Sequence, residues 1–532
     1  MAPSTMKLLF GAAVLIFGAS LLTTAEASKI LFAMPFAATS HSNVITALAK
    51  ELTRRGHSVT VITPVPIKDV PMNYTQIDVS EIMKGKFQSP KVTDQHGVIE
   101  TCFLISRISN DVCNSTLREP AVQELINGAK SGKGFDLVVV SMFYCECAYS
   151  FAHIFDTPLV LMSPAGSFPV TDSLVGNPAI TSFVPDLFSS FSDNMNLMER
   201  TLNTLLHMAT LTFHYTLIYP KHNTILSEVF GSSFPNVHEL EKRVSLVLLN
   251  SHHSILFPRP MVPNLVEVGG IHVKPPKALP QDIKKMLDEA KNGVIYFSLG
   301  SNLKSADLPE SMREALMGAF RELKQTVLWK WEVDSLPGQP ANVKISKWWP
   351  QADILAHPNV KMFITHGGLL SFQEAVDRGV PLIGIPFYGD QDMNMKRVSQ
   401  LGVGLKMDFQ TITKEVVLEN INTILKDQSF SKKMKDLSGI WKDRPESAME
   451  RAVYWIEYVL RHNGAKHMKS GAVELGWCQY YLIDVASILV GAVLLVLAIL
   501  VFTLKFLFGL CKRKPTKKAG GKDKSSKQKK HQ

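Results

Sequence analysis

Residues 348–391 read WWPQADILAHPNVKMFITHGGLLSFQEAVDRGVPLIGIPFYGDQ. Within this stretch an apolar run, Met362 to Thr365, leads through His366 and the pair Gly367-Gly368 into a helical pattern. A strand that ends at glycines and continues as a helix is the unit of doubly wound α/β sheets. The N–H groups at a helix N-terminus attract anions, and glycines let the backbone approach them closely. The stretch therefore predicts an α/β fold with a seat for an anion such as a diphosphate.

The same alternation of strands and helices extends on both sides of this stretch. Downstream of residue 281 we expect strands at 293–298 and 326–331 around a helix at 308–323. Near the N-terminus a strand at 29–34, a helix at 43–55 and a strand at 58–63 repeat the pattern, as do residues 136–162. Such alternation predicts parallel strands joined by crossover helices. A chain of 532 residues has room for two such domains.

A proline-rich segment separates the two regions. Residues 274–280 read KPPKALP, which can continue neither a helix nor a strand, so we interpret them as a linker. The predicted N-terminal domain is 28–273 and the predicted C-terminal domain is 281–440. A returning helix and a juxtamembrane segment are expected at 441–484. Residues 181–219, rich in Phe, Leu and Met, predict helices that cover an apolar pocket, touch a membrane surface or pack in the core.

Both ends of the chain carry targeting patterns. Residues 1–27 combine a lysine, an apolar run and small residues at a cleavage spacing, as in a secretory signal peptide. Residues 485–510 are the predicted transmembrane helix, and the basic tail 511–532 is expected in the cytosol. Lys529 and Lys530 match a di-lysine retrieval signal read by coat machinery, although such a tail could also bind anionic lipid. The patterns predict a single-pass type I protein of the endoplasmic reticulum membrane with a lumenal bulk.

The net charge of +10 is concentrated in this tail. From Lys512 onward ten Lys or Arg and one Asp give +9, which leaves +1 for all preceding residues. A basic field confined to a tail gives the folded part no means of holding a polyanion. We therefore exclude nucleic acid as a partner. Oligomeric state stays open, a homo-oligomer included.

A lumenal location bears on cysteines and on asparagines. Asn73 and Asn114 begin N-x-S/T sequences, which are glycosylation acceptors in that compartment. Five cysteines would be exposed to oxidation, with a pairing that the sequence leaves open: Cys102, Cys113, Cys145, Cys147 and Cys478.

The 44 residues quoted first closely resemble the signature of the UDP-glycosyltransferase family (UDP-glucuronosyl and UDP-glucosyl transferases), and membrane-bound members of arthropod type most of all. The resemblance implies an α/β fold of GT-B type, with two doubly wound Rossmann-like domains facing across a cleft, here followed by one C-terminal transmembrane helix. It also implies a UDP-sugar as co-substrate and a small lipophilic acceptor. Carried over by position, it assigns donor binding to Arg259, Ser301, Trp348, Gln351, His366, Gly367, Gly368, Ser371, Glu374, Asp390 and Gln391.

The resemblance also suggests individual roles in the donor site. Trp348 would stack on the uracil, Gln351 would bond the uridine, and Glu374 would hold the ribose hydroxyls. Asp390 and Gln391 would grip the transferred sugar. Asp390-Gln391-Asp392 also fits the D-x-D pattern of metal-dependent transferases, but at this family spacing we expect sugar recognition without a metal.

His41 follows the first predicted strand, at the position of the family's catalytic histidine. A histidine there can take the proton of an acceptor hydroxyl at neutral pH, and attack from the far side inverts the anomeric centre. The family orients this histidine with an aspartate from a later strand, where this chain offers Glu146. We therefore expect His41 and Glu146 to form the catalytic pair.

Two leucines depart from many vertebrate members of the family. Leu369 and Leu370 replace small and polar residues, as arthropod-type members allow, so UDP-glucose is the expected donor and UDP-glucuronate an alternative. The expected activity is conjugation of a hexose to lipophilic hydroxyls, as in detoxification. The competing hypothesis is a non-catalytic lumenal protein of the same fold that binds a UDP-sugar or a lipid. The acceptor itself cannot be read from the sequence.

Overall fold

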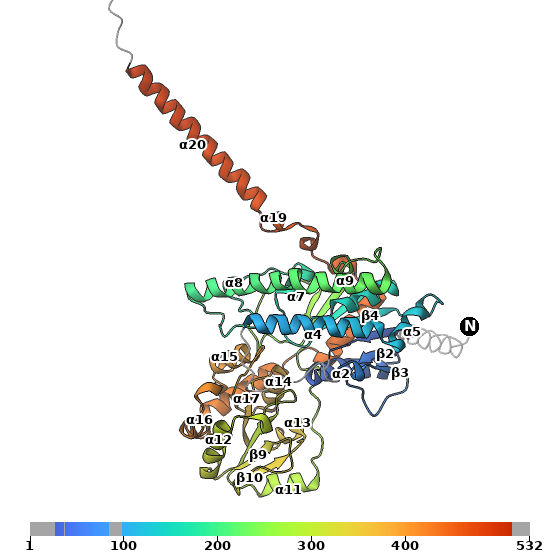
Figure 1. The fold of residues 1–532 in the computed structure, drawn as a ribbon. Helices are drawn as coiled ribbons and strands as arrows, with labels where there is room; N and C mark the ends of the chain where they lie inside the picture. The colour runs from blue at the N-terminus through green and yellow to red at the C-terminus, as the bar shows by residue number, and fades with distance from the viewer. Residues whose placement is uncertain (1–26, 37, 84–97, 513–532) are drawn as a thin grey trace, which may run out of the picture. The chain divides into compact units, whose positions relative to one another are not determined.

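The computed structural model describes residues 27–36, 38–83 and 98–512, in two compact units that divide after Val473 (Figure 1). The predicted signal peptide lies outside the described residues except for Ala27, and the retrieval lysines Lys529 and Lys530 lie outside them altogether. The first unit contains two parallel sheets, each with helices on its faces.

The N-terminal sheet has seven parallel strands in the order β3-β2-β1-β4-β5-β6-β7. Its strands are β1 Lys29–Ala33, β2 Ser58–Thr63, β3 Tyr74–Asp78, β4 Leu137–Ser141, β5 Leu159–Ser163, β6 Val244–Leu249 and β7 Leu265–Glu267. Every residue of β4, β5 and β6 is buried, as expected for a parallel sheet covered on both faces. Alternate residues of β1 serve two cores, with Leu31 and Ala33 in one and Ile30 and Phe32 in the other.

Helices of the N-terminal half connect these strands. They are α2 Thr39–Arg54, α3 Ser80–Met83, α4 Val98–Arg118, α5 Pro120–Ala129, η1 Glu146–Tyr149, α6 Ser150–Ile154, α7 Pro169–Val175, α8 Leu197–Phe213, α9 Tyr219–Phe230 and α10 Val237–Glu241. Between α8 and α9 the chain forms one wide π-type turn, η2 His214–Ile218, so that α8, η2 and α9 make one long helical stretch. A disulfide joins Cys113 of α4 to Cys147 of η1.

The C-terminal sheet has six parallel strands in the order β10-β9-β8-β11-β12-β13. Its strands are β8 Val294–Ser298, β9 Thr326–Lys330, β10 Val343–Ser346, β11 Val360–Thr365, β12 Leu382–Gly384 and β13 Gly404–Lys406. The helices of this half are α11 Gln281–Glu289, η3 Ser305–Asp307, α12 Glu310–Glu322, α13 Gln351–Ile354, α14 Leu369–Arg378, α15 Gln391–Leu401, η4 Phe409–Thr411, α16 Lys414–Lys426 and α17 Gln428–Lys442.

Each sheet reverses its strand order once, between β1 and β4 in the first and between β8 and β11 in the second. Ligands of open α/β sheets bind outside the carboxyl ends of the strands at such a point. Two doubly wound sheets in one compact unit agree with the predicted pair of Rossmann-like domains. The topology therefore predicts that ligands bind at the loops after β1, β4, β8 and β11.

The last helix of the first unit, α18 Ala448–Arg461, packs on the N-terminal sheet. Ala452, Val453 and Ile456 are fully buried in the same core as Leu48 of α2 and Leu246 of β6. The chain thus returns to its first half after completing the second. Short turns η5 Lys466–Met468 and η6 Gly471–Glu474 follow.

The second unit holds a short helix, α19 Trp477–Tyr480, and a long one, α20 Ile483–Cys511. At about 1.5 Å per residue, the 29 residues of α20 exceed the roughly 30 Å thickness of a bilayer core. Among the described residues α20 alone is both long and apolar enough to cross a membrane. The predicted C-terminal apolar helix, 485–510, is present with slightly wider bounds.

Candidate active site

The His366 imidazole follows β11 and lies between two glycines. A Cβ atom added to Gly300 would come within 2.6 Å of the ring, and one added to Gly368 within 2.5 Å. Only glycine fits at these two positions, one in each loop at the reversal point of the second sheet. Burial, helped by the charge of Lys330, lowers the pKa of His366 to about 4. A neutral ring here can donate one hydrogen bond to an anion.

The helix α14 begins directly after this histidine. Its first residue is Leu369, so the free N–H groups of its first turn lie beside His366 and Gly368. Leu370 packs against the core shared by β1 and α18. The predicted anion seat is therefore assembled from β11, the two glycines and α14.

Three of the predicted donor-binding residues lie together. Gln351 donates from Nε2 to Glu374 at 2.7 Å and to Ser371 at 3.3 Å. Burial raises the pKa of Glu374 to about 6, although the bond from Gln351 works against the rise. His272, which sequence reasoning missed, lies 3.8 Å from Glu374 and arrives from the segment after β7. Trp348 is 67% exposed, so its ring is free to stack on a base.

The predicted sugar-binding residues lie at the start of α15, with Asp390 at its N-cap and Gln391 as its first residue. Asp390 accepts a bond from Asn394, which also donates to the carbonyl of Gly367 and so ties the start of α15 to the anion seat. Burial raises the pKa of the Asp390 carboxyl. Gln391 accepts at Oε1 from the backbone N–H groups of residues 387 and 388, which fixes its side chain.

The second aspartate of the D-x-D sequence has a different partner. Asp392 forms an ion pair with Lys406, so the two carboxylates of the sequence are engaged separately. The described residues contain no cluster of three or more metal-ligating side chains.

Lys330 is a further charged residue that sequence reasoning missed. Its ammonium donates to the carbonyl of Gly300 at 2.9 Å and to Glu332 at 2.8 Å. Gly300 lies one residue before the predicted donor residue Ser301, which is exposed. Lys330, the last residue of β9, therefore holds the loop after β8 in place. A lysine at the end of an otherwise apolar strand is the sequence feature that could have predicted this role.

Arg259, predicted for the donor, is engaged elsewhere. Its guanidinium donates to the carbonyl of Ser167 at 3.2 Å and pairs with Asp172 at 3.4 Å. With Asp186 and His207 it lines a cavity of the N-terminal half. None of these contacts belongs to the donor cluster described above.

His41 lies in the first turn of α2, after β1. Its ring meets Phe143 edge-on, with 4.8 Å between centroids, and Phe36 stands 6.3 Å away. Nδ1 is buried and has no hydrogen-bond partner among the described residues. Burial lowers the pKa of His41 to about 4, so the ring is neutral and able to accept a proton at physiological pH.

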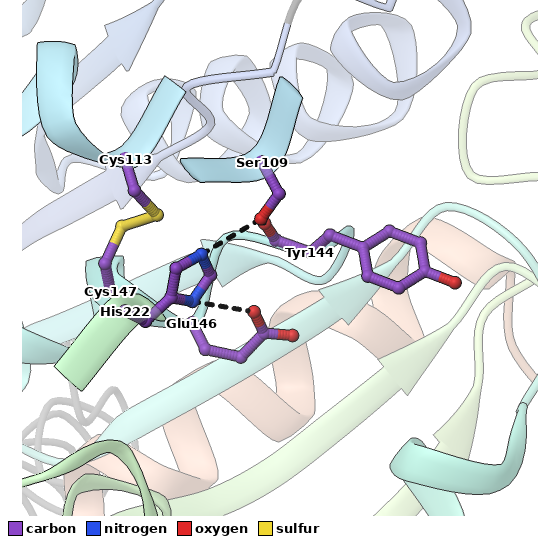
Figure 2. Close-up of a disulfide and its surroundings, with 6 residues drawn as sticks. All are labelled: Ser109, Cys113, Tyr144, Glu146, Cys147 and His222. Carbon is purple, nitrogen blue, oxygen red and sulfur yellow. Dashed lines mark hydrogen bonds and ion pairs between the residues drawn. A yellow bond between two sulfur atoms is a disulfide. The ribbon is translucent and has the colours of Figure 1, made fainter. Parts of the chain in front are cut away.

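Glu146 does not pair with His41, contrary to the expected catalytic pair. Its carboxylate accepts from His214 at 2.6 Å. The other carboxylate oxygen stands 3.2 Å from Nδ1 of His222, as Figure 2 shows. Burial alone would raise the pKa of Glu146, but the two histidines together lower it well below the usual range. The sequence placed this carboxylate in the correct loop, but its partners come from a helical stretch about 70 residues away, which no local pattern reveals.

A hydrogen-bonded chain continues from this carboxylate. The other nitrogen of His222 lies 2.9 Å from Oγ of Ser109, and Ser109 donates to the carbonyl of Tyr144 (Figure 2). Tyr144 holds a left-handed φ of 51°, directly after the Phe143 that touches His41. The network and the nearby disulfide therefore hold the loop after β4, and through it the aromatic neighbour of His41.

Among the other cysteines, Cys145 is buried and free, and Cys478 and Cys511 are free and exposed. Asn73 is exposed at the start of β3, as a glycosylation acceptor requires. Asn114 is half-buried within α4 and accepts a bond from Arg118.

Two doubly wound parallel sheets, with a glycine-flanked histidine at the reversal point of the second, are the architecture of a GT-B glycosyltransferase. The profile of the family described as "UDP-glucoronosyl and UDP-glucosyl transferase" matches residues 29–518, so the chain belongs to this family. It is similar to UDP-glycosyltransferase UGT5 of Dactylopius coccus, at 38% identity over 91% of this chain and 93% of that one.

Two more comparisons agree. UDP-glucosyltransferase 2 of the same insect is 38% identical over 88% of this chain and 91% of its own. A solved UDP-glucosyltransferase from Polygonum tinctorium shares the fold, with a TM-score of 0.56 at 19% identity over 82% of this chain and 99% of that one.

Proposed function

We propose that the protein transfers glucose from UDP-glucose to a hydroxyl group of a small lipophilic acceptor, with inversion, as in detoxification. The observation that carries the proposal is His41, a neutral histidine whose buried Nδ1 has no partner among the described residues and whose ring lies beside two packed aromatic rings. Such a group can take a proton only from a molecule that enters the site, and the rings of Phe36 and Phe143 favour an apolar one.

The proposed reaction is a single displacement at the anomeric carbon, with His41 as the base and UDP as the leaving group. His41 accepts the hydroxyl proton while the acceptor oxygen bonds to the anomeric carbon of the sugar. The bond from that carbon to the phosphate oxygen breaks, and UDP leaves with its electron pair. His366 and the first turn of α14 would stabilise the charge that develops on the diphosphate.

We assign the remaining donor contacts as expected from the sequence. Trp348 stacks on uracil, Gln351 and Glu374 hold uridine, and Asp390 and Gln391 hold the sugar. Arg259 would have to leave Asp172 to take part. The preference for glucose is supported by the arthropod-type leucines and by the name of the second insect relative.

We also propose that α20 anchors the protein in the endoplasmic reticulum membrane, with the first unit in the lumen, Asn73 and Asn114 as glycosylation acceptors, and the tail read by coat machinery in the cytosol. Support comes from the length and composition of α20, the basic residues after it and the disulfide in the first unit, since disulfides persist in oxidising compartments.

The test is a donor comparison with the full chain in microsomes. UDP-glucose, UDP-glucuronate and UDP-galactose are each supplied with phenols and sterols, and UDP release and product mass are followed. Conjugation with UDP-glucose alone supports the proposal. Faster conjugation with UDP-glucuronate or UDP-galactose would contradict the donor assignment, and UDP binding without any turnover would contradict catalysis.

A further inference from the structure

Lys330 is the only buried lysine or arginine among the described residues, with 7% of its surface exposed. It ends β9 at the carboxyl edge of the second sheet, where β8 and β11 also end. A charge that is taken out of water is costly unless its partners compensate for the lost hydration. A lysine at this edge therefore points to a role in the site and not only in the core.

Lys330 and Glu332 form an ion pair that holds the loop after β8 at two points. The ammonium donates to the carbonyl of Gly300 at 2.9 Å and to Oε1 of Glu332 at 2.8 Å. The other oxygen of Glu332 accepts from the N–H group of Ala306 at 3.2 Å. The Glu332 side chain is itself mostly buried. One ion pair thus fixes both ends of the segment from Gly300 to Ala306.

The segment that this pair holds lies directly beside His366. A Cβ atom on Gly300 would stand 2.6 Å from the imidazole, so the glycine is packed against the ring. The N–H group of Gly300 donates to Oγ of Ser298 at 3.2 Å, so both backbone polar groups of this glycine are engaged. The next residue, Ser301, is exposed, and neither its N–H group nor its hydroxyl bonds to another described residue. Ser301 can therefore donate to an anion bound next to His366.

The ammonium of Lys330 also acts on the imidazole through space. Its charge adds to the effect of burial in lowering the pKa of His366, so the ring stays an uncharged donor. Donors that are fixed in advance stabilise the charge on a leaving group without having to reorganise. Loss of Lys330 would release the carbonyl of Gly300 and leave the carboxylate of Glu332 without its counter-charge.

We propose that the pair of Lys330 and Glu332 positions the seat of the donor diphosphate. By holding the loop after β8 against His366, it fixes Ser301 and the imidazole at the spacing that the two phosphates require. Both are positioning residues, because they act through the loop. The proposal rests on the proposed function, since it assigns this seat to the diphosphate of a UDP-sugar. The pair then contributes to binding of the phosphates and not of the nucleoside.

The experiment measures the affinities of UDP and of uridine by calorimetry, with the full chain purified in detergent micelles. Lys330→Met should weaken UDP binding at least tenfold and change uridine binding less than twofold, because only the phosphates reach the loop. Lys330→Arg, which restores the charge and a donor for Gly300, should recover most of the UDP affinity. The matched control is Lys414→Met, which removes a lysine from an exposed ion pair with Glu322 in the same half and should bind both ligands normally.

A second variant separates positioning from simple charge. Glu332→Ala removes a negative charge near the seat, so charge alone predicts tighter binding of UDP. Positioning predicts the opposite, because the bond to Ala306 and the partner of Lys330 are both lost. We expect at least a fivefold weaker UDP affinity with unchanged uridine affinity. If Lys330→Met does not fold, as judged by circular dichroism melting, Glu332→Ala carries the test alone.

The outcomes that would overturn the positioning role are distinct from those that concern catalysis. Equal losses for UDP and uridine would reduce the pair to a structural role, and tighter UDP binding by Glu332→Ala would reduce it to a charge effect. Either result overturns the proposal. Sugar transfer is followed in the same preparations. A wild type that binds UDP but transfers no sugar would contradict the proposed function alone, since the binding comparison does not depend on turnover.

Discussion

Nε2 of His214 donates to Oε1 of Glu146 over 2.6 Å, and both side chains are almost completely buried. This contact joins the π-type turn after α8 to the loop after β4. Since His222 of α9 approaches the other carboxylate oxygen, a single acidic group holds three segments of the N-terminal half together.

Replacing this acid should destabilise the fold. Glu146→Gln keeps the size but loses the charge that both histidines face, and breaking a buried pair costs about 3 to 5 kcal/mol. The matched control is Glu228→Gln, which breaks an exposed pair with Arg118 and should cost at most about 1 kcal/mol. Thermal unfolding midpoints of the two variants measure the difference, and equal midpoints would show that the buried pair is not stabilising.

The disulfide between Cys113 and Cys147 should stabilise the same region. It closes a segment of 34 residues, for which loss of chain entropy predicts on the order of 4 kcal/mol. We expect Cys113→Ser/Cys147→Ser to lower the unfolding midpoint, while Cys478→Ser, which removes an exposed free thiol, leaves it unchanged. Mapping by mass spectrometry without reductant should find the 113–147 bridge; a bridge between other cysteines would refute this connectivity.

The glycine beside His366 can be tested without backbone strain. Gly368 has a φ of −63°, so Gly368→Ala is disfavoured only because the new methyl group would stand 2.5 Å from the imidazole. We expect at least a tenfold loss of UDP affinity, measured by calorimetry. Gly439→Ala, in α17 with open space around it, should bind UDP normally and gain up to about 1 kcal/mol of stability. Unchanged UDP binding by Gly368→Ala would place the anion elsewhere.

The acid limb of the pH profile should reflect the lowered pKa of His41. A general base works only when unprotonated, and burial lowers this pKa to about 4, so activity is lost only as the pH falls toward 4. At pH 5 kcat/KM for the acceptor should retain about 90% of its plateau, whereas an ordinary histidine of pKa near 6.5 would leave about 3%. Saturating UDP-glucose keeps Glu374, with its pKa of about 6, from contributing. An acid limb near 6.5 would mean that His41 gains a partner absent from this structure.

The sequence predicted most of what local patterns encode. The strand at 58–63 was placed without error, and the strand before His366 begins two residues earlier than expected. The helix expected at 43–55 begins at Thr39, since no proline or capping residue marks its start. Gln351, Ser371 and Glu374 were expected at the donor because of the family resemblance, and in the structure their side chains lie in contact; their role in donor binding stays a prediction.

Such local patterns do not predict contacts between segments that are distant in the sequence. The partners of Glu146 are His214 and His222, and those of Arg259 are Ser167 and Asp172; each pairing depends on how helices pack and not on sequence spacing. The helix α4, with Ser109 and Cys113, was not expected at all. The expected pairing of Glu146 with His41 came from the family's aspartate at that junction; in the structure Glu146 contacts His214 and His222 instead, and Nδ1 of His41 has no partner among the described residues.

The most direct test of His41 as the general base is the turnover rate of His41→Ala, compared with that of the wild type in the same microsomal preparation. Product is followed by mass, and UDP binding is measured separately. We expect loss of turnover by at least 10²-fold, the usual contribution of a general base, with UDP affinity unchanged because the predicted donor residues lie in the other half of the first unit. Turnover within a few fold of wild type would contradict the role of His41 as the base.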